Sequence, residues 1–134
     1  MDAGGNLYIA DSGDHRIRKV DATGKITTFA GRGIEGFTDG GQAAKVLLSQ
    51  PSDVAVDSKG NVYIADAGNF RIRKVVSSGA ISTFAGTGEE GFSGDGGQAT
   101  AAAIGSVSSL AFDTADNLYL ADLSFYHIRK ITPA

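Results

Sequence analysis

Two histidines and a set of recurring aspartates are the side chains with which this chain could perform acid–base or metal chemistry. His15 and His127 occupy different positions of a sequence repeat, because His15 aligns with Phe70 whereas His127 aligns with Arg71. A catalytic zinc site takes three protein ligands, which two histidines from separate repeat copies do not supply. The sequence also contains no nucleophile elbow, Cys–His pair or H-E-x-x-H motif. These observations favour a protein that is not an enzyme.

Two glycine-rich segments have the pattern of ligand-binding loops. The sequence G-x-G-x-x-G occurs at 31–36 and at 86–91. Neither copy opens a predicted helix, and two glutamates in the second copy would repel phosphate, so we interpret both as connecting loops. An aspartate stands within a glycine turn at 38–41 and again at 93–97, but one carboxylate supplies too few oxygens for calcium. We therefore predict no cofactor and no bound metal.

One aspartate recurs at the same place in each repeat copy, as Asp11, Asp66 and Asp122. A catalytic residue has no reason to occur three times, so the recurrence indicates a structural role. We expect these carboxylates to cap a turn or to pair with an arginine. The arginines at the matching positions of the following strand are Arg18, Arg73 and Arg129.

These side chains belong to a longer segment that occurs three times. Its copies are GNLYIAD at 5–11, GNVYIAD at 60–66 and DNLYLAD at 116–122. The spacing is 55 residues from Asn6 to Asn61 and 56 residues from Asn61 to Asn117. A period of this length indicates supersecondary units that stack on one another.

The central unit predicts a four-stranded antiparallel meander, because four apolar segments alternate with short turns. In the second segment Val62 and Ile64 point to one face while Tyr63 and Ala65 point to the other, so both faces are apolar. Such a strand needs a packed layer on each side, which neighbouring copies can provide. The predicted strands are 54–56, 62–65, 71–76 and 80–85.

The central copy closely resembles the NHL repeat in PSDVAVD at 51–57, GNVYIAD at 60–66 and NFRIRK at 69–74. This resemblance covers nearly the whole chain, and it implies a β-propeller, commonly of six blades. The chain departs from the family pattern at Asp53 and Ser109, where the family usually has glycine. The third copy also has Ser124 and Phe125 in place of the glycine and asparagine of the second copy.

The predicted fold is therefore all-β, a propeller of NHL-type four-stranded antiparallel blades that is incomplete as a single chain. A ring of six blades at this period would need roughly 330 residues. We expect self-association, or the remaining blades of a longer chain, to complete it. The single domain, 1–134, comprises partial blade 1 at 1–31, blade 2 at 51–86, partial blade 3 at 107–132, and loops at 32–50 and 87–106. A short helix is expected within each loop, at 42–48 and 98–104.

The composition of the chain limits the kinds of partner that we expect it to bind. Hydrophobic residues make up 42% of the chain and charged residues 20%, which is typical of a soluble globular domain. A net charge of −3 gives no electrostatic reason to expect nucleic acid, and no apolar run is long enough to span a membrane. Cysteine is absent, and the N-terminal residues do not predict a signal peptide. The resemblance suggests an exported or surface protein of a bacterium, whereas the residues themselves indicate no compartment.

The function predicted from this resemblance is a structural or interaction module that binds a protein, peptide or carbohydrate ligand. In a propeller the connections between second and third strands and those between blades emerge on one face, where loop residues are free to vary. The candidate ligand-binding residues on this loop face are Asp14, His15, Ile34, Glu35, Asn69, Phe70, Glu89, Glu90, Phe125 and Tyr126. The alternative is a fragment of a propeller lyase or lactonase with a metal in the central channel. The available ligands there are Asp53, Asp57 and Asp113.

Overall fold

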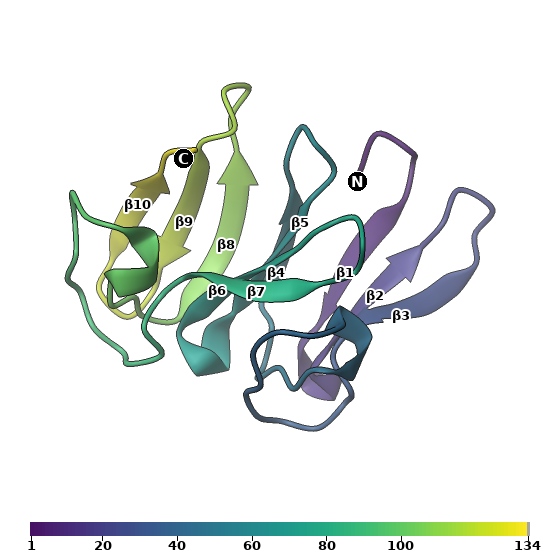
Figure 1. The fold of residues 1–134 in the computed structure, drawn as a ribbon, viewed down its shortest axis with the longest axis horizontal. Helices are drawn as coiled ribbons and strands as arrows, with labels where there is room; N and C mark the ends of the chain where they lie inside the picture. Colours follow the sequence, from purple (N-terminus) through teal and green to yellow (C-terminus); the bar gives the residue numbers. More distant parts are fainter. Residues whose placement is uncertain (134) are drawn as a thin grey trace.

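Three antiparallel sheets stand side by side in the computed structural model, which describes residues 1–133 (Figure 1). Blade 1 consists of β1 (Leu7–Asp11), β2 (Arg16–Val20) and β3 (Ile26–Ala30). Blade 2 consists of β4 (Asp53–Val56), β5 (Val62–Asp66), β6 (Arg71–Val75) and β7 (Ile81–Ala85). Blade 3 consists of β8 (Val107–Phe112), β9 (Leu118–Asp122) and β10 (His127–Ile131). Strands adjacent in sequence pair within each blade, as the meander prediction requires. The three sheets do not close into a ring, so the prediction of an incomplete propeller is confirmed.

A carboxylate network shapes the turn that precedes β1, β5 and β9, the equivalent strands of the three blades. In blade 2 the Asp57 carboxylate accepts bonds from the backbone N–H of Lys59 and Asn61, from the Asn61 side chain at 2.8 Å and from the Tyr63 hydroxyl at 3.2 Å. Blades 1 and 3 repeat this network around Asp2 and Asp113. Aspartate favours such turns because its short side chain can bond to the backbone that follows it.

The pKa values of these groups follow from the same bonds. The Asn117 side chain and backbone N–H hold the pKa of Asp113 below its ordinary value. The matching bonds from Asn6 lower the pKa of Asp2 to about 2. Burial, and then the neighbouring Asp2 carboxylate, raises the pKa of Tyr8 to about 12. The turn of blade 1 therefore keeps an ionised aspartate beside a neutral tyrosine at neutral pH.

The core lies between the blades. On β5, Val62 and Ile64 belong to the apolar cluster shared with blade 1, whereas Tyr63 and Ala65 belong to the cluster shared with blade 3. All four side chains are buried, which confirms that both faces of this strand are covered. The tyrosine ring meets Phe84 of its own blade and one aromatic ring of blade 3 edge-to-face, an arrangement that stabilises aromatic pairs.

The two ends of the arc are open. Ile9 in blade 1 occupies the repeat position of Ile64 in blade 2, yet it is 38% exposed while Ile64 is 0% exposed. At the other end, Ile128 of β10 is 70% exposed while its counterpart Ile72 is 0% exposed. Burial in this protein is therefore set by neighbouring blades and strands and not by residue type alone.

Each inter-blade loop packs onto the outer part of the blade that follows it. The loop after β3 donates from Ala43 N–H to the carbonyl of Gly79, and its Gly41 carbonyl accepts from Ile81 N–H. The expected helices are only single 3-10 turns, η2 (Ala43–Lys45) and η4 (Ala99–Ala101). In both loops the last residues of the expected helix are extended instead, because Leu48 pairs with Glu35 and Ile104 with Glu90 in parallel bridges. Among residues 1–133 no helix is long and apolar enough to cross a bilayer.

Candidate functional site

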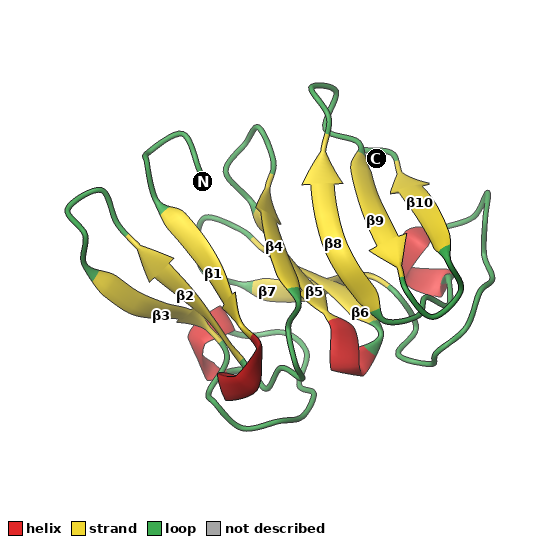
Figure 2. Cartoon of the chain, turned by 180° about the vertical axis from the view of Figure 1, so that it is seen from behind, coloured by secondary structure: helices red, strands yellow, loops and turns green. Residues whose placement is uncertain are grey.

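The loop face is built from the turns that join β1 to β2, β5 to β6 and β9 to β10, which we call the tips, and from the inter-blade loops beside them (Figure 2). The tips are the 3-10 turns η1 (Ser12–Asp14) and η3 (Ala67–Asn69) and the turn at 123–126. Each tip contacts the loop beside it. Gly68 N–H donates to the Ser49 carbonyl at 2.9 Å, and Leu123 N–H donates to the Ser106 carbonyl at 3.0 Å. The tips and the inter-blade loops therefore lie at the same end of the sheets, as the propeller geometry predicts.

One residue at each tip adopts a left-handed backbone conformation. The φ angles are 52° at His15, 51° at Phe70 and 57° at Tyr126. This region is uncommon for side chains other than glycine, asparagine and aspartate. The tight turn places these variable side chains at the loop face, where Tyr126 is 92% exposed and the other two are half-buried. His15 also accepts a bond from Gln50 N–H on its Nδ1 at 3.0 Å, so this histidine joins a tip to an inter-blade loop.

The recurring aspartate fixes each loop to the next blade. The buried Asp66 carboxylate accepts from Ser49 N–H at 2.8 Å, from the Asn69 side chain at 2.9 Å and from Arg73 at 3.2 Å. Burial raises the pKa of Asp66, and these three bonds oppose that rise. Asp66 thus fulfils the predicted pairing with the arginine of the following strand, whereas the predicted cap is absent, because the carboxylate accepts no backbone N–H of the η3 turn.

The two outer copies of this aspartate differ from the central one. Asp122 accepts from the backbone N–H groups of Gly105, Ser124 and Phe125, which confirms the capping role. The predicted pairing with Arg129 is wrong, because that arginine binds Asp95 at 2.7 Å. Within residues 1–133 the Asp11 carboxylate makes no hydrogen bond, and no inter-blade loop approaches it. Neither predicted role is therefore seen for Asp11 within residues 1–133, whereas the equivalent Asp66 binds the inter-blade loop through Ser49.

Arginines on β6 and β10 bind the same inter-blade loops. Arg73 is 0% exposed and binds the Thr38 carbonyl at 2.7 Å and the Asp39 carboxylate at 3.0 Å. Its counterpart Arg129 binds the Ser93 carbonyl and Asp95, so the extra residue in the longer repeat is accommodated between these two contacts. Each arginine directs two of its guanidinium N–H groups at one short stretch of the loop. This arrangement makes the contact between strand and loop more specific as well as stronger.

An aromatic residue of each loop lies next to these side chains. Phe37 lies beneath the Arg71 guanidinium, which is 3.8 Å from the centre of the ring. At the same place in blade 3, His127 stacks on Phe92 with ring centres 4.3 Å apart. The second histidine thus replaces an arginine in an aromatic contact.

A serine and a glycine exchange places between the two blade junctions. At the first junction Ser49 faces Gly68, and at the second Gly105 faces Ser124. In both cases the serine hydroxyl donates to a glutamate of the loop, to Glu35 at 2.9 Å in the first and to its counterpart at 2.7 Å in the second. The hydroxyl is thus supplied by the loop in one junction and by the tip in the other. This exchange gives a structural reason for the third copy's departure from the repeat pattern.

This exchange predicts the outcome of a double-mutant cycle. A Cβ at Gly68 would lie 2.8 Å from the Cβ of Ser49, so Gly68→Ser is expected to cost about 1–3 kcal/mol of unfolding free energy by overpacking. Adding Ser49→Gly removes the clash with the serine side chain and leaves one hydroxyl beside Glu35, as in the second junction, while the carbonyl oxygen of residue 49 stays 2.9 Å from the new Cβ. We expect the double variant to regain part of the loss in urea denaturation. A double variant no more stable than Gly68→Ser would contradict the exchange.

The predicted ligand-binding residues fall into two groups. Asn69, Glu35, Glu90 and His15 each bond to a neighbouring tip or loop, so they also hold the face together. The others present side chains at the surface or half-buried at a tip: Asp14, Ile34, Phe70, Glu89, Phe125 and Tyr126.

Sequence reasoning missed Phe92, which lies beside the predicted residue Phe125. Its ring is 6.3 Å from that of Phe125, and the side chain is 42% exposed. The signal for it was present, since Phe92 is the repeat counterpart of Phe37 in the other loop. We call Phe92, Phe125, Tyr126 and His127 the aromatic cluster of the loop face.

The proposed channel ligands do not come together. Asp57 and Asp113 lie in the equivalent hairpin turns of two blades and are engaged by their own asparagines, so the expectation that they line the channel as ligands is wrong. Asp53 instead accepts from the hydroxyl of Ser109 at 3.1 Å and from Leu110 N–H at 2.7 Å. The two departures from the family's glycines therefore bind one another across adjacent blades. Within residues 1–133 no three histidine, aspartate or glutamate side chains are placed to hold a metal ion.

The chain is similar in sequence to one protein family and to several known proteins. A family model described as the Teneurin NHL domain matches residues 1–76 and 34–91. Teneurin-4 of Homo sapiens is 32% identical over 146 residues, which cover 94% of this chain and 5% of the relative. NHL repeat-containing protein 2 of Gallus gallus is 36% identical over 97 residues, covering 71% of this chain and 13% of the relative. The chain thus spans a small part of the curated relatives that it matches. These relatives are eukaryotic, so a bacterial source stays a prediction.

Solved structures agree with the fold. A structural genomics protein of unknown function from Bacteroides thetaiotaomicron superimposes with a TM-score of 0.83 at 26% identity, covering 93% of this chain and 32% of that protein. A streptogramin B lyase superimposes with a TM-score of 0.67 at 14% identity, covering 98% of this chain and 35% of the lyase. At that identity the likeness to the lyase concerns the fold alone.

Proposed function

The chain belongs to the NHL-repeat family, and from that premise we propose that it is an interaction module whose loop face binds a protein ligand. The observation that supports this proposal best is the aromatic cluster. Tyr126 is 92% exposed at a tip whose backbone is fixed by a left-handed turn, and Leu123 beside it is 60% exposed. Large side chains held in a rigid surface lose little conformational entropy on binding, and tyrosine and phenylalanine are enriched at the centres of protein interfaces.

The surroundings of the aromatic cluster also suit a protein ligand. Glu89 and Glu90 lie on the loop that carries Phe92, while Arg129 lies 4.9 Å from the ring of that phenylalanine. An apolar centre with charged groups of both signs beside it is the usual anatomy of a protein interface. Ile34, 58% exposed on the first inter-blade loop, adds a second apolar position on the same face.

Selection from a displayed library of random peptides tests the proposal. We expect selected peptides to bind the whole chain and to lose at least about tenfold in affinity when Tyr126 is replaced by alanine, because truncation of a central aromatic side chain typically costs more than 1 kcal/mol. Affinities would be measured by titration calorimetry with synthetic copies of the selected peptides.

Val76→Ala is the matched control for this experiment. Val76 is 37% exposed, but it follows β6 at the end of the blade opposite the tips, so its replacement should leave peptide affinity within about twofold. Peptides that bind Tyr126→Ala as tightly as the parent, or a library that yields no binders while a carbohydrate array does, would contradict a protein-binding loop face.

A further inference from the structure

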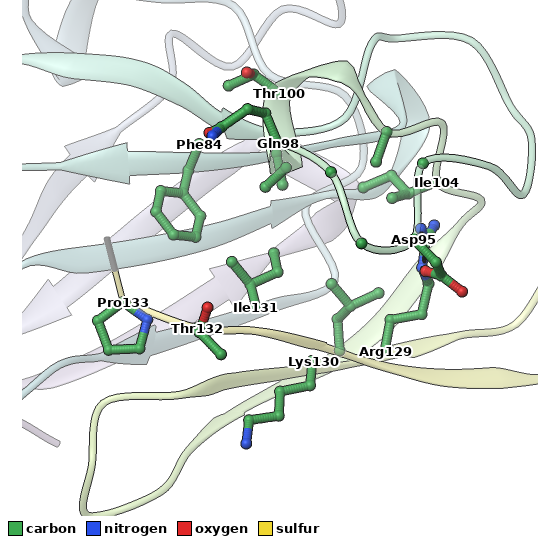
Figure 3. A pocket seen from close by; sticks show the side chains of 17 residues that line it. Phe84, Asp95, Gln98, Thr100, Ile104, Arg129, Lys130, Ile131, Thr132 and Pro133 are labelled. Carbon is green, nitrogen blue, oxygen red and sulfur yellow. Dashed lines mark hydrogen bonds and ion pairs between the residues drawn. The ribbon is translucent and has the colours of Figure 1, made fainter.

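A pocket of about 200 Å³ lies between blades 2 and 3, at the end of the sheets opposite the tips. Residues of the turns that precede β5 and β9 form its rim. Six side chains from the two blades line its walls: Tyr63, Lys74, Phe84, Phe112, Leu118 and Ile131. Part of this wall is visible in Figure 3, where the Phe84 ring lies next to Ile131 and Lys130 points away from it. The pocket therefore belongs to the contact between two blades.

Three aromatic rings form the apolar part of the pocket. Tyr63 packs edge-to-face on both Phe84 and Phe112, with ring centres 4.9 Å apart in each pair. The two phenylalanines are only half-buried, so each leaves part of its ring for a ligand. Pockets for drug-sized ligands have volumes of about 300 Å³ or more, and they are lined mainly by apolar and aromatic side chains. This smaller pocket therefore suits a ligand with a single ring.

An ammonium group is held beside these rings. Lys74 Nζ lies 5.5 Å from the centre of the Tyr63 ring and 6.0 Å from that of Phe84. A cation over an aromatic face is attracted by the ring, so these contacts hold the lysine in place. Lys59 adds a second ammonium group at the rim, and within residues 1–133 neither lysine forms an ion pair. The pocket thus has two cationic donors without a carboxylate partner.

Two carboxylates also lie at the rim, and the protein itself occupies both of them. Asp57 accepts the bonds of its own turn, from Lys59 N–H, from Asn61 and from the Tyr63 hydroxyl. Asp116 accepts from the N–H of Ser58 at 3.0 Å and from the hydroxyl of the same serine, so it bridges the turns of two blades. The polar groups left for a ligand are therefore the two ammonium groups, which favour an anion.

The junction between blades 1 and 2 lacks several of these groups. The residues at the matching positions are Val56 for Phe112, Gly4 for Lys59, Ala3 for Ser58 and Gly60 for Asp116. The second junction thus has a third ring, a second cation and a bridge across the rim that the first junction does not have. The repeat packs two blades together without them, so packing alone does not account for these residues.

We propose that this pocket binds a small aromatic carboxylate, in which a short chain joins one ring to one carboxylate. The ring of the ligand lies between Phe84 and Phe112, and its carboxylate accepts from Lys74, with Lys59 beside it at the rim. The pocket is at the opposite end of the sheets from the tips, so this proposal does not rest on ligand binding by the loop face.

NMR titration of the isotope-labelled whole chain with phenylpropionate tests the proposal. We expect saturable shifts of the amides of Asn61 and Leu118, with a dissociation constant in the millimolar range because so small a ligand makes few contacts. The neutral probe phenylpropanamide keeps the ring and the chain but carries no charge. It should bind roughly tenfold more weakly, since a hydrogen bond between two charged groups is about twice as strong as one between neutral groups.

Variants of the protein test the same contacts from the other side. Lys74→Met keeps most of the side-chain stem and removes the ammonium group, so we expect a loss of roughly tenfold in affinity for phenylpropionate. Phe112→Val installs the residue of the first junction and should weaken binding roughly threefold to tenfold. The matched control is Lys19→Met. Lys19 occupies the same repeat position in blade 1, with Nζ 5.8 Å from the centre of the Tyr8 ring, and its replacement should leave the affinity within about twofold.

Four results would overturn the proposal. They are the absence of saturable shifts, equal affinity for the acid and the amide, parental affinity in Lys74→Met, and shifts confined to the tips. If Lys74→Met does not fold, the comparison of acid and amide still decides the question. Tyr126→Ala should not change binding of phenylpropionate, so failure of the loop-face proposal and failure of this one are distinguishable.

Discussion

Replacing Asp66 with alanine is expected to lower the unfolding free energy by about 3–5 kcal/mol, the range found when one partner of a buried ion pair is removed. The carboxylate and the Arg73 side chain are both 0% exposed, so the buried arginine would lose its buried counter-charge and keep only the half-exposed Asp39 carboxylate. Ser49 N–H and the Asn69 amide would lose their acceptor as well. Urea denaturation followed by circular dichroism measures the loss.

Asp11→Ala is the control for this prediction. The two aspartates occupy the same repeat position, but Asp11 makes no hydrogen bond within residues 1–133, so its replacement should change stability by no more than about 0.5 kcal/mol. Equal losses in the two variants would mean that the effect comes from the strand end itself and not from the incoming loop. Should Asp66→Ala fail to fold, Asp66→Asn retains an acceptor for Ser49 N–H and should show an intermediate loss.

Replacing Ile64 with alanine is expected to cost about 2–5 kcal/mol, because the residue is fully buried between blades 1 and 2 and the surrounding side chains cannot fill the space left behind. The matched variant is Ile9→Ala. Ile9 is 38% exposed at the open face of blade 1, so its truncation removes less buried area and should cost about 1 kcal/mol.

This pair of variants also tests self-association through blade 1. If a second chain covered the open face in solution, Ile9 would be as buried as Ile64 and the two losses would converge, increasingly so at higher protein concentration. Measuring both variants at two concentrations separates these outcomes. Losses that differ and do not depend on concentration would exclude that mode of ring completion.

Much of the fold was predictable because every strand of the repeat occurs two or three times in the chain. The alternation in Val62–Asp66 indicated a strand buried on both faces, and the short turns between segments required antiparallel pairing. The expected helices failed for a physical reason. Leu48 and Ile104, in the second half of each expected helix, form a bridge with the start of their own loop, so only one 3-10 turn remains in each loop.

The candidate site was predictable only in part. The tips and loops were placed on one face by the propeller geometry, but the partners of individual side chains were not. Asp57 looked available for a metal, whereas its oxygens are occupied by the asparagine and tyrosine that follow it in the same hairpin. A D-x-x-x-N-x-Y spacing, present in all three copies, carried that information. The exchange of Ser49 for Gly105 depends on two positions that are far apart in the sequence, and a single chain gives no sign that they meet.

Because each loop is attached to the blade that follows it, the structural unit begins earlier in the chain than the sequence repeat does. The sequence repeat suggests a module that begins with β4, yet Asp66 and Arg73 draw most of their partners from residues 35–50, ahead of that strand. A blade excised at residue 51 would keep its four strands and lose the acceptors and donors that hold its buried charges. The portable module of this chain therefore begins at the end of β3 and ends with β7. Insertion or recombination at the end of β3, ahead of the loop, would transfer a blade together with the loop that binds its buried charged side chains.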